Sequence, residues 1–146
     1  MSALSWACTA GCALLLAAAL AGAPDSTALA RDPIALAGAP DHIPWLSDEA
    51  QARAESRRAG KPLLIDLQAD WCGACKMLEA DTWSDPEVRR QAARFVPLRL
   101  DLSAQDEATR AVSERYQVAS LPVVIAGEHR ASGFLGPKEM LELMRK

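Results

Sequence analysis

Two cysteines three positions apart are the part of this sequence best suited to chemistry. Cys72 and Cys75 lie in the stretch ADWCGACK, directly after the apolar run KPLLIDLQA, whereas Cys8 and Cys12 fall within the first 30 residues. A disulfide that closes so short a loop gains little from chain entropy, so it is poorly explained as a structural cross-link. The pair is therefore predicted to react by thiol–disulfide exchange, with no cofactor beyond the two thiols.

The position of each cysteine predicts a different role. Cys72 follows a strand and begins a helix, where free backbone N–H groups and the helix dipole stabilise a thiolate, so it is predicted to be the exposed nucleophile. Cys75 lies one turn further along the same helix face. It is predicted to be the more shielded thiol, which resolves the mixed disulfide.

Asp66 lies six residues before Cys72, inside the apolar run LLIDLQ. A charge in a buried strand is costly unless it has a partner or stays partly protonated. Asp66 is therefore predicted to accept and return the proton of Cys75, directly or through a water. The alternative is a carboxylate at the edge of the strand that faces solvent.

The elements that must hold these residues alternate between helices and strands. Helices are predicted over 48–59, 72–80, 86–94, 103–116 and 137–146, and strands over 61–69, 95–102, 122–126 and 129–134. Strands separated by helices imply parallel pairing, whereas the two consecutive strands near the end imply an antiparallel edge. The prediction is an α/β fold with a central mixed sheet of about four strands and helices on both faces.

Length and composition favour one folded domain. The chain has 146 residues, is 50% hydrophobic and carries a net charge of −3, which gives no electrostatic sign of nucleic-acid binding. Residues 31–44 contain several prolines and are predicted to be a linker, and residues 45–146 the domain, expected to be a monomer.

Residues 1–30 are typical of an export segment. They contain no Lys or Arg, an Ala/Leu-rich block over 12–23 and the A-x-A pattern Ala28-Leu29-Ala30. Three alternatives are a signal peptide cleaved after that pattern, an uncleaved membrane anchor over 4–23, and lipidation at Cys12. Each places the domain outside the cytoplasm, in the periplasm or an equivalent compartment, either secreted or tethered by the N-terminal segment.

The stretch DLQADWCGACK resembles the active-site segment of thioredoxin-fold proteins. GKPLLIDLQADWCGACK followed by TWSDPEV is similar, more specifically, to the C-terminal periplasmic domain of the transmembrane disulfide reductase DsbD and its stand-alone relatives, over about residues 45–146. The resemblance implies a cis bond between Leu121 and Pro122 that faces the cysteines and binds an extended client segment. It also implies that Trp71 flanks the reactive sulfur. Disulfide-bonded clients and a membrane or thioredoxin-like electron donor are the expected partners.

Other functions stay open beside that of a reductase. The same cysteine pair serves oxidases and isomerases, and the residues between the cysteines tune the potential. A metal site is not predicted, because structural zinc wants four ligands and His42 and His129 have no ligand-like spacing to the cysteines. A non-catalytic interaction domain is disfavoured by the intact pair together with Asp66 and Pro122.

Overall fold

The computed structural model describes residues 40–146. Its helices and strands, in chain order, are α1 (Glu49–Ala59), β1 (Leu63–Gln68), α2 (Gly73–Met77), the π-helix η2 (Leu78–Trp83), α3 (Pro86–Ala92), β2 (Val96–Asp101), α4 (Glu107–Arg115), β3 (Val123–Ala126), β4 (His129–Ser132) and α5 (Pro137–Arg145). The predicted signal peptide, membrane anchor and lipidation site at Cys12 lie outside the described residues. None of the helices within residues 40–146 is long and apolar enough to cross a membrane.

The four strands form one mixed sheet in the order β2-β1-β3-β4, so the predicted α/β architecture is confirmed. β1 pairs with β2 in parallel, and β3 pairs with β4 antiparallel, both as predicted. The helix between β2 and β3 also predicts parallel pairing for β3, and this prediction is wrong, because β3 lies antiparallel beside β1. The connection through α4 starts and finishes at the same end of the sheet. β3 therefore begins beside the last residues of β1, and Val123 pairs with Leu67. The residues before β3 are thereby placed beside those that follow β1.

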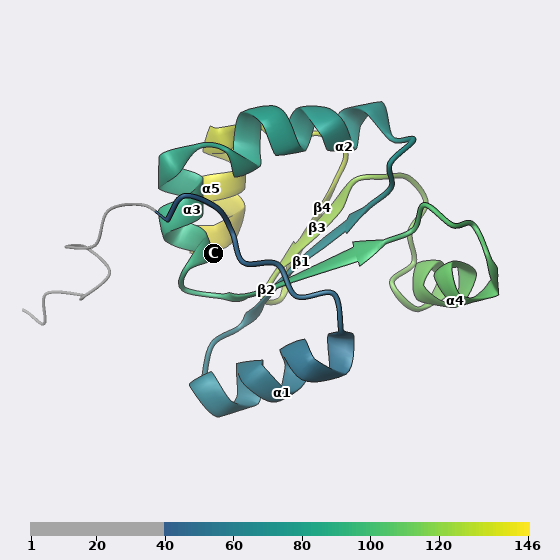
Figure 1. The fold of residues 1–146 in the computed structure, drawn as a ribbon. Coiled ribbons are helices and arrows are strands. Elements are labelled where there is room, and N and C mark those ends of the chain that lie inside the picture. Colours follow the sequence, from purple (N-terminus) through teal and green to yellow (C-terminus); the bar gives the residue numbers. More distant parts are fainter. Residues whose placement is uncertain (1–39) are drawn as a thin grey trace, which may run out of the picture. The chain divides into compact units, whose positions relative to one another are not determined.

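Helices cover both faces of the sheet, α1 and α4 on one face and α2, η2, α3 and α5 on the other (Figure 1). Successive side chains along β1 point to opposite faces of the sheet. Ile65 and Leu67 belong to the hydrophobic cluster on the α1 and α4 side, whereas Leu64 packs with α3 and α5. Asp66 shares the face of Leu64, since side chains two residues apart in a strand point the same way. Its carboxylate therefore points toward the helices that follow the cysteines.

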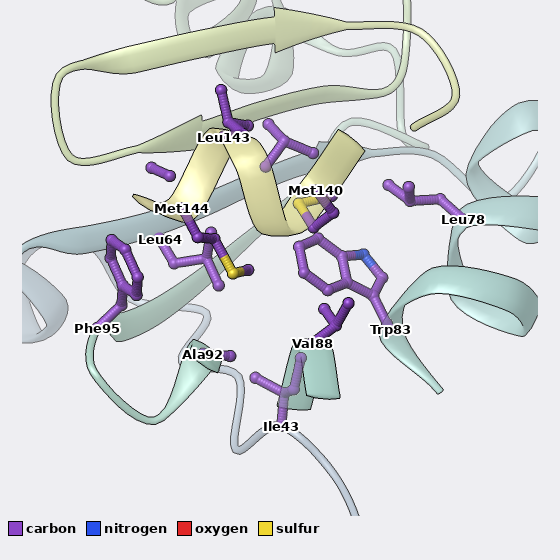
Figure 2. Close-up of a cluster of buried hydrophobic side chains, with 12 residues drawn as sticks. Ile43, Leu64, Leu78, Trp83, Val88, Ala92, Phe95, Met140, Leu143 and Met144 are labelled. Atoms are coloured by element: carbon purple, nitrogen blue, oxygen red, sulfur yellow. The ribbon is translucent and has the colours of Figure 1, made fainter. Parts of the chain in front are cut away.

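A second hydrophobic cluster fills the space between the sheet and the helices η2, α3 and α5 (Figure 2). The side chains that α5 contributes are Met140, Leu143 and Met144. Ile43 is buried in the same cluster, although it belongs to the segment 31–44 that the sequence predicts to be a linker. The packed part of the chain thus includes residues before Trp45, the predicted start of the domain.

Helix α3 begins with an N-terminal cap. The carboxylate of Asp85 accepts the backbone N–H groups of Glu87 and Val88 at 2.8 and 3.0 Å. Replacing Asp85 by alanine leaves both donors without this acceptor and is expected to lower the free energy of unfolding by about 1 kcal/mol, measured by urea denaturation. The exposed Asp81 lies within η2 and is not an N-terminal cap, so Asp81→Ala is the control and should stay within about 0.5 kcal/mol. Equal losses in the two variants would contradict the capping role.

Candidate active site

The two cysteines lie directly after β1 and are joined by a disulfide, with Cα atoms 5.3 Å apart. Cys72 is the N-terminal cap of α2, and its Sγ accepts the backbone N–H of Cys75 at 3.1 Å. Both residues are buried in this oxidised state, with 7% of Cys72 and 4% of Cys75 exposed. The predicted contrast between an exposed and a shielded sulfur is therefore small here, because Ala69 and Leu121 pack against the disulfide-bonded pair.

The loop before β3 lies against the cysteine pair. The peptide bond between Leu121 and Pro122 is cis, the geometry that the resemblance implies. Leu121 packs on the cluster that contains both cysteines, and Pro122 is fully buried. The carbonyl oxygen of Pro122 accepts the N–H of Gly133 at 2.8 Å. Gly133 has a φ of 86°, a backbone conformation that favours glycine.

A groove of about 750 Å³ opens beside this loop. Trp71 and Leu121 line it together with Thr109 and Arg110 of α4. Trp71 is 55% exposed, and a half-exposed tryptophan offers a large apolar face for contact with another chain. The structure thus brings together Trp71 and Leu121, both predicted from the sequence to contact a client.

Asp66 is buried, with 2% of its surface exposed, so the alternative of a carboxylate that faces solvent is wrong. Burial raises the pKa of Asp66 to about 6, while the charge and the hydrogen bond of Arg99 lower it and the charge of Glu79 raises it. The Oδ1 atom of Asp66 has no hydrogen-bond partner within residues 40–146. The indole N–H of Trp83, which also has no hydrogen-bond partner among these residues, lowers the pKa of Asp66 as well.

Arg99 and Glu79 form a charged cluster with Asp66 that sequence reasoning missed. Arg99 Nε donates to Asp66 Oδ2 at 3.0 Å, and Arg99 Nη2 donates to Glu79 Oε2 at 2.6 Å. The guanidinium carbon also lies 4.4 Å from the ring centroid of Trp45. Arg99 could have been found only from the strand register, because Asp66 and Arg99 are direct partners in the parallel pairing of β1 and β2. That register comes from the tertiary structure.

Residues 44–126 match the family model described as Thioredoxin-like. The chain belongs to the thioredoxin-like family. Its fold resembles the crystal structure of the Neisseria meningitidis DsbD C-terminal domain in the reduced form, with a TM-score of 0.55 and 25% identity, over 68% of this chain and 96% of that one.

Two curated relatives of this thioredoxin-like chain are thiol:disulfide interchange proteins. DsbD 1 of Pseudomonas aeruginosa is 38% identical over 74 residues, which are 51% of this chain and 12% of the relative. DsbD of Cronobacter sakazakii is 44% identical over 73 residues, which are 50% of this chain and 13% of the relative. The chain therefore matches only a small part of the length of these relatives.

The helix after the cysteines is longer than predicted in this thioredoxin-like domain. The sequence predicts an end near Ala80, but the helix continues to Trp83 as the π-helix η2. The hydroxyl of Thr82 donates to the carbonyl of Leu135 at 2.5 Å, and Trp83 is buried in the core. These two contacts are with distant residues, so local sequence did not predict the wider turn. π-helical turns are rare and often occur at functional sites.

The two histidines do not join the cysteines. His42 lies beside a small cavity with Glu79 and Trp83, and His129 lies at the end of β4 away from the cysteine pair. In the part of the chain that the structure describes, no group of three or more His, Cys, Asp or Glu side chains is placed to hold a metal ion.

Proposed function

We propose that this domain is a thiol–disulfide oxidoreductase that works as a protein-disulfide reductase outside the cytoplasm. The observation that carries the proposal is the Cys72–Cys75 disulfide with the cis Leu121–Pro122 loop packed against it. The names of the matching thiol:disulfide interchange proteins support the chemistry. The resemblance to the C-terminal domain of DsbD favours the reducing direction.

In the first step, the Cys72 thiolate of the reduced domain attacks one sulfur of a client disulfide. A bond forms between Cys72 Sγ and that sulfur, the S–S bond of the client breaks, and the departing client thiolate takes a proton from water. The helix start and the N–H of Cys75, which reaches Cys72 Sγ in the oxidised state, favour the thiolate. Trp71 and the backbone at Leu121 and Pro122 hold the client segment.

In the second step, Cys75 resolves the mixed disulfide. Its thiol gives a proton to Asp66, directly or through a water, and the thiolate attacks Cys72 Sγ. The bond between Cys72 and the client breaks, and the second client sulfur leaves as a thiolate that takes up the proton returned by Asp66, directly or through a water. The client has gained two electrons and the domain holds its disulfide. A pKa of about 6 suits Asp66 to this role, since it is mostly ionised at neutral pH yet binds a proton more readily than an ordinary aspartate.

A dithiol donor must return two electrons to the oxidised domain before the next cycle. We propose a membrane protein or another thioredoxin-like protein as this donor, disulfide-bonded exported proteins as clients, and a monomer as the working state. Residues 1–30 would export or anchor the domain. Fusing residues 1–44 to alkaline phosphatase, which folds only where its disulfides form, tests the location. Phosphatase activity is expected, and its absence would contradict export.

Two measurements test the activity and its direction. The reduced protein is expected to speed the reduction of insulin disulfides by dithiothreitol, followed as turbidity. Its equilibrium potential against glutathione is expected to be below about −200 mV, in the range of reducing thioredoxin-like proteins. A potential near about −120 mV would contradict the reductase and favour the oxidase alternative. Failure to speed insulin reduction would favour the non-catalytic alternative.

A further inference from the structure

Three helices finish at the end of the sheet that lies opposite the cysteines (Figure 1). The last turn of α1 contains Arg57 and Arg58, and the last turn of α5 contains Arg145. Arg94 lies between the end of α3 and the start of β2. Basic residues are favourable at such positions, because the free carbonyl groups at a helix C-terminus attract a cation. This end of the domain therefore collects the basic residues of three helices.

Four basic side chains gather around one hollow at this end. Arg94, Arg145 and Lys146 line the hollow, which has a volume of about 370 Å³. Lys61 lies next to it, since its Nζ donates to the backbone carbonyl of Ala93 at 2.9 Å, one residue before Arg94. All four residues are exposed. We call Lys61, Arg94, Arg145 and Lys146 the basic end of the domain.

No ion pair offsets the charge of the basic end within residues 40–146. The ion pairs found there are made by other arginines: Arg53, Arg58, Arg90, Arg99 and Arg115. Arg94 donates to an uncharged oxygen, Oε1 of Gln91, at 3.5 Å. Glu128 is the one acidic side chain among those that line the hollow. The basic end is thus a positive surface on a chain whose net charge is −3.

The chain enters the domain at the basic end. Pro40, the first residue that the structure describes, lines a groove of about 280 Å³ together with Lys61 and Phe95. Phe95 also lines the hollow, so the groove and the hollow are neighbours. Residues 4–23, which precede this point in the chain, carry no charge and are the predicted membrane anchor. An anchor there would bring the basic end next to a membrane.

The cysteines lie at the other end of the domain. Strand β1 leads from Lys61 to the cysteine pair, and its six residues at about 3.3 Å each separate the two ends by about 20 Å. A surface bound to the basic end therefore leaves the disulfide and the groove beside Trp71 open to other proteins.

We propose that the basic end binds the surface of a membrane that contains anionic phospholipids. Guanidinium and ammonium groups donate charge-assisted hydrogen bonds to phosphate oxygens. An anionic membrane surface favours the bound state by a factor of about five for each basic residue near it. The inference rests on the proposed location of the domain outside the cytoplasm beside a membrane, and it does not depend on the redox chemistry.

The four lysines of the chain report how the protein lies on a vesicle. Lys61 and Lys146 belong to the basic end, whereas Lys76 in α2 and Lys138 in the first turn of α5 lie toward the cysteines. Oxidised full-length protein is mixed with vesicles of phosphatidylcholine that contain about 30% phosphatidylglycerol, and acetylation of each lysine by a water-soluble reagent is followed by mass spectrometry. Compared with pure phosphatidylcholine vesicles, acetylation at the basic end is expected to slow by at least about three-fold, and acetylation of the other two lysines to stay unchanged.

Arg94→Gln combined with Arg145→Gln removes two charges from the basic end and keeps all four reporting lysines. At about five-fold per residue, partition onto the anionic vesicles is expected to fall about 25-fold, and the protection of the lysines at the basic end should disappear. Lys76→Gln combined with Lys138→Gln removes the same charge from the other end. This matched control should keep the protection. About 0.5 M sodium chloride, which screens charges beyond about 4 Å, should abolish it.

Three results would overturn the inference. The lysines of the basic end could react equally fast with anionic and neutral vesicles, all four lysines could be protected alike, or protection could survive in the double arginine variant. Residues 1–30 contain no Lys or Arg, so anchoring by them does not favour anionic over neutral vesicles. The assay needs neither turnover nor export. Failure to reduce insulin, or a phosphatase fusion without activity, would refute the proposed function and leave the lysine result standing.

Discussion

Replacing Cys72 by serine is expected to abolish catalysed disulfide reduction, with a fall of at least about 100-fold to the rate of dithiothreitol alone. A serine hydroxyl is not ionised at neutral pH, so the helix start no longer supplies a nucleophile that can open the client disulfide. Cys75 is not expected to replace it, because Cys75 lies one turn further into the helix, whereas Cys72 is the N-terminal cap of α2. The measurement is the initial rate of insulin reduction by the full-length protein.

Cys75→Ser is the matched control for this variant. It keeps the nucleophile but removes the thiol that resolves the intermediate, so a mixed disulfide between Cys72 and the client is expected to accumulate and to be visible by mass spectrometry. Both variants retain Cys8 and Cys12, so the difference between them reports on the cysteine pair alone. Activity that survives in Cys72→Ser, or a mixed disulfide on Cys75 of the wild type, would refute the assignment of the nucleophile.

Replacing Asp66 by asparagine is expected to stabilise the oxidised protein by about 3 kcal/mol at pH 7 while slowing disulfide reduction. The pKa of Asp66 is raised from 3.8 to about 6 in the fold. The folded state therefore binds this proton more tightly than the unfolded state, and the associated stability is present below pH 3.8 and lost as the pH rises through about 6. A shift of about two units corresponds to about 3 kcal/mol.

Urea unfolding of wild type and Asp66→Asn at several pH values checks this prediction. The two proteins should differ little near pH 4, where Asp66 is protonated in the fold, and the variant should gain its advantage between about pH 4 and pH 7. Asp81→Asn, which neutralises an exposed carboxylate, is the control and should change the free energy of unfolding by less than about 0.5 kcal/mol at every pH measured. A difference that does not depend on pH would show that Asp66 is not held at a raised pKa.

The order of helices and strands followed from local patterns because each pattern has a local cause. The apolar run around Leu64 predicts a buried strand, and the cap at Asp85 with Pro86 predicts a helix start. The direction of β3 could not be predicted in this way. It depends on where the connection through α4 returns to the sheet, which no residue within β3 determines.

The candidate site shows the same contrast between residues that local patterns identify and residues that only the tertiary structure brings in. Cys72, Cys75 and Asp66 stood out from the sequence, since their spacing and their position in or beside an apolar run are unusual. Glu79 gave no such signal, because an exposed acid on a helix is common. Its position next to Arg99 depends on the path of η2, which is set by contacts of Thr82 and Trp83 with distant residues.

The sequence by itself determined the reactive pair, the buried carboxylate and the alternating α/β pattern, because these are properties of neighbouring residues. Only the tertiary structure decided which charge meets Asp66, whereas the loop that covers the cysteines was implied by the family resemblance and by no local pattern. Strand register brings Arg99 to Asp66, and the antiparallel return of β3 brings Leu121 to the disulfide. Both pairings join residues far apart in the chain, and burial of the core on the two faces of the sheet sets their geometry.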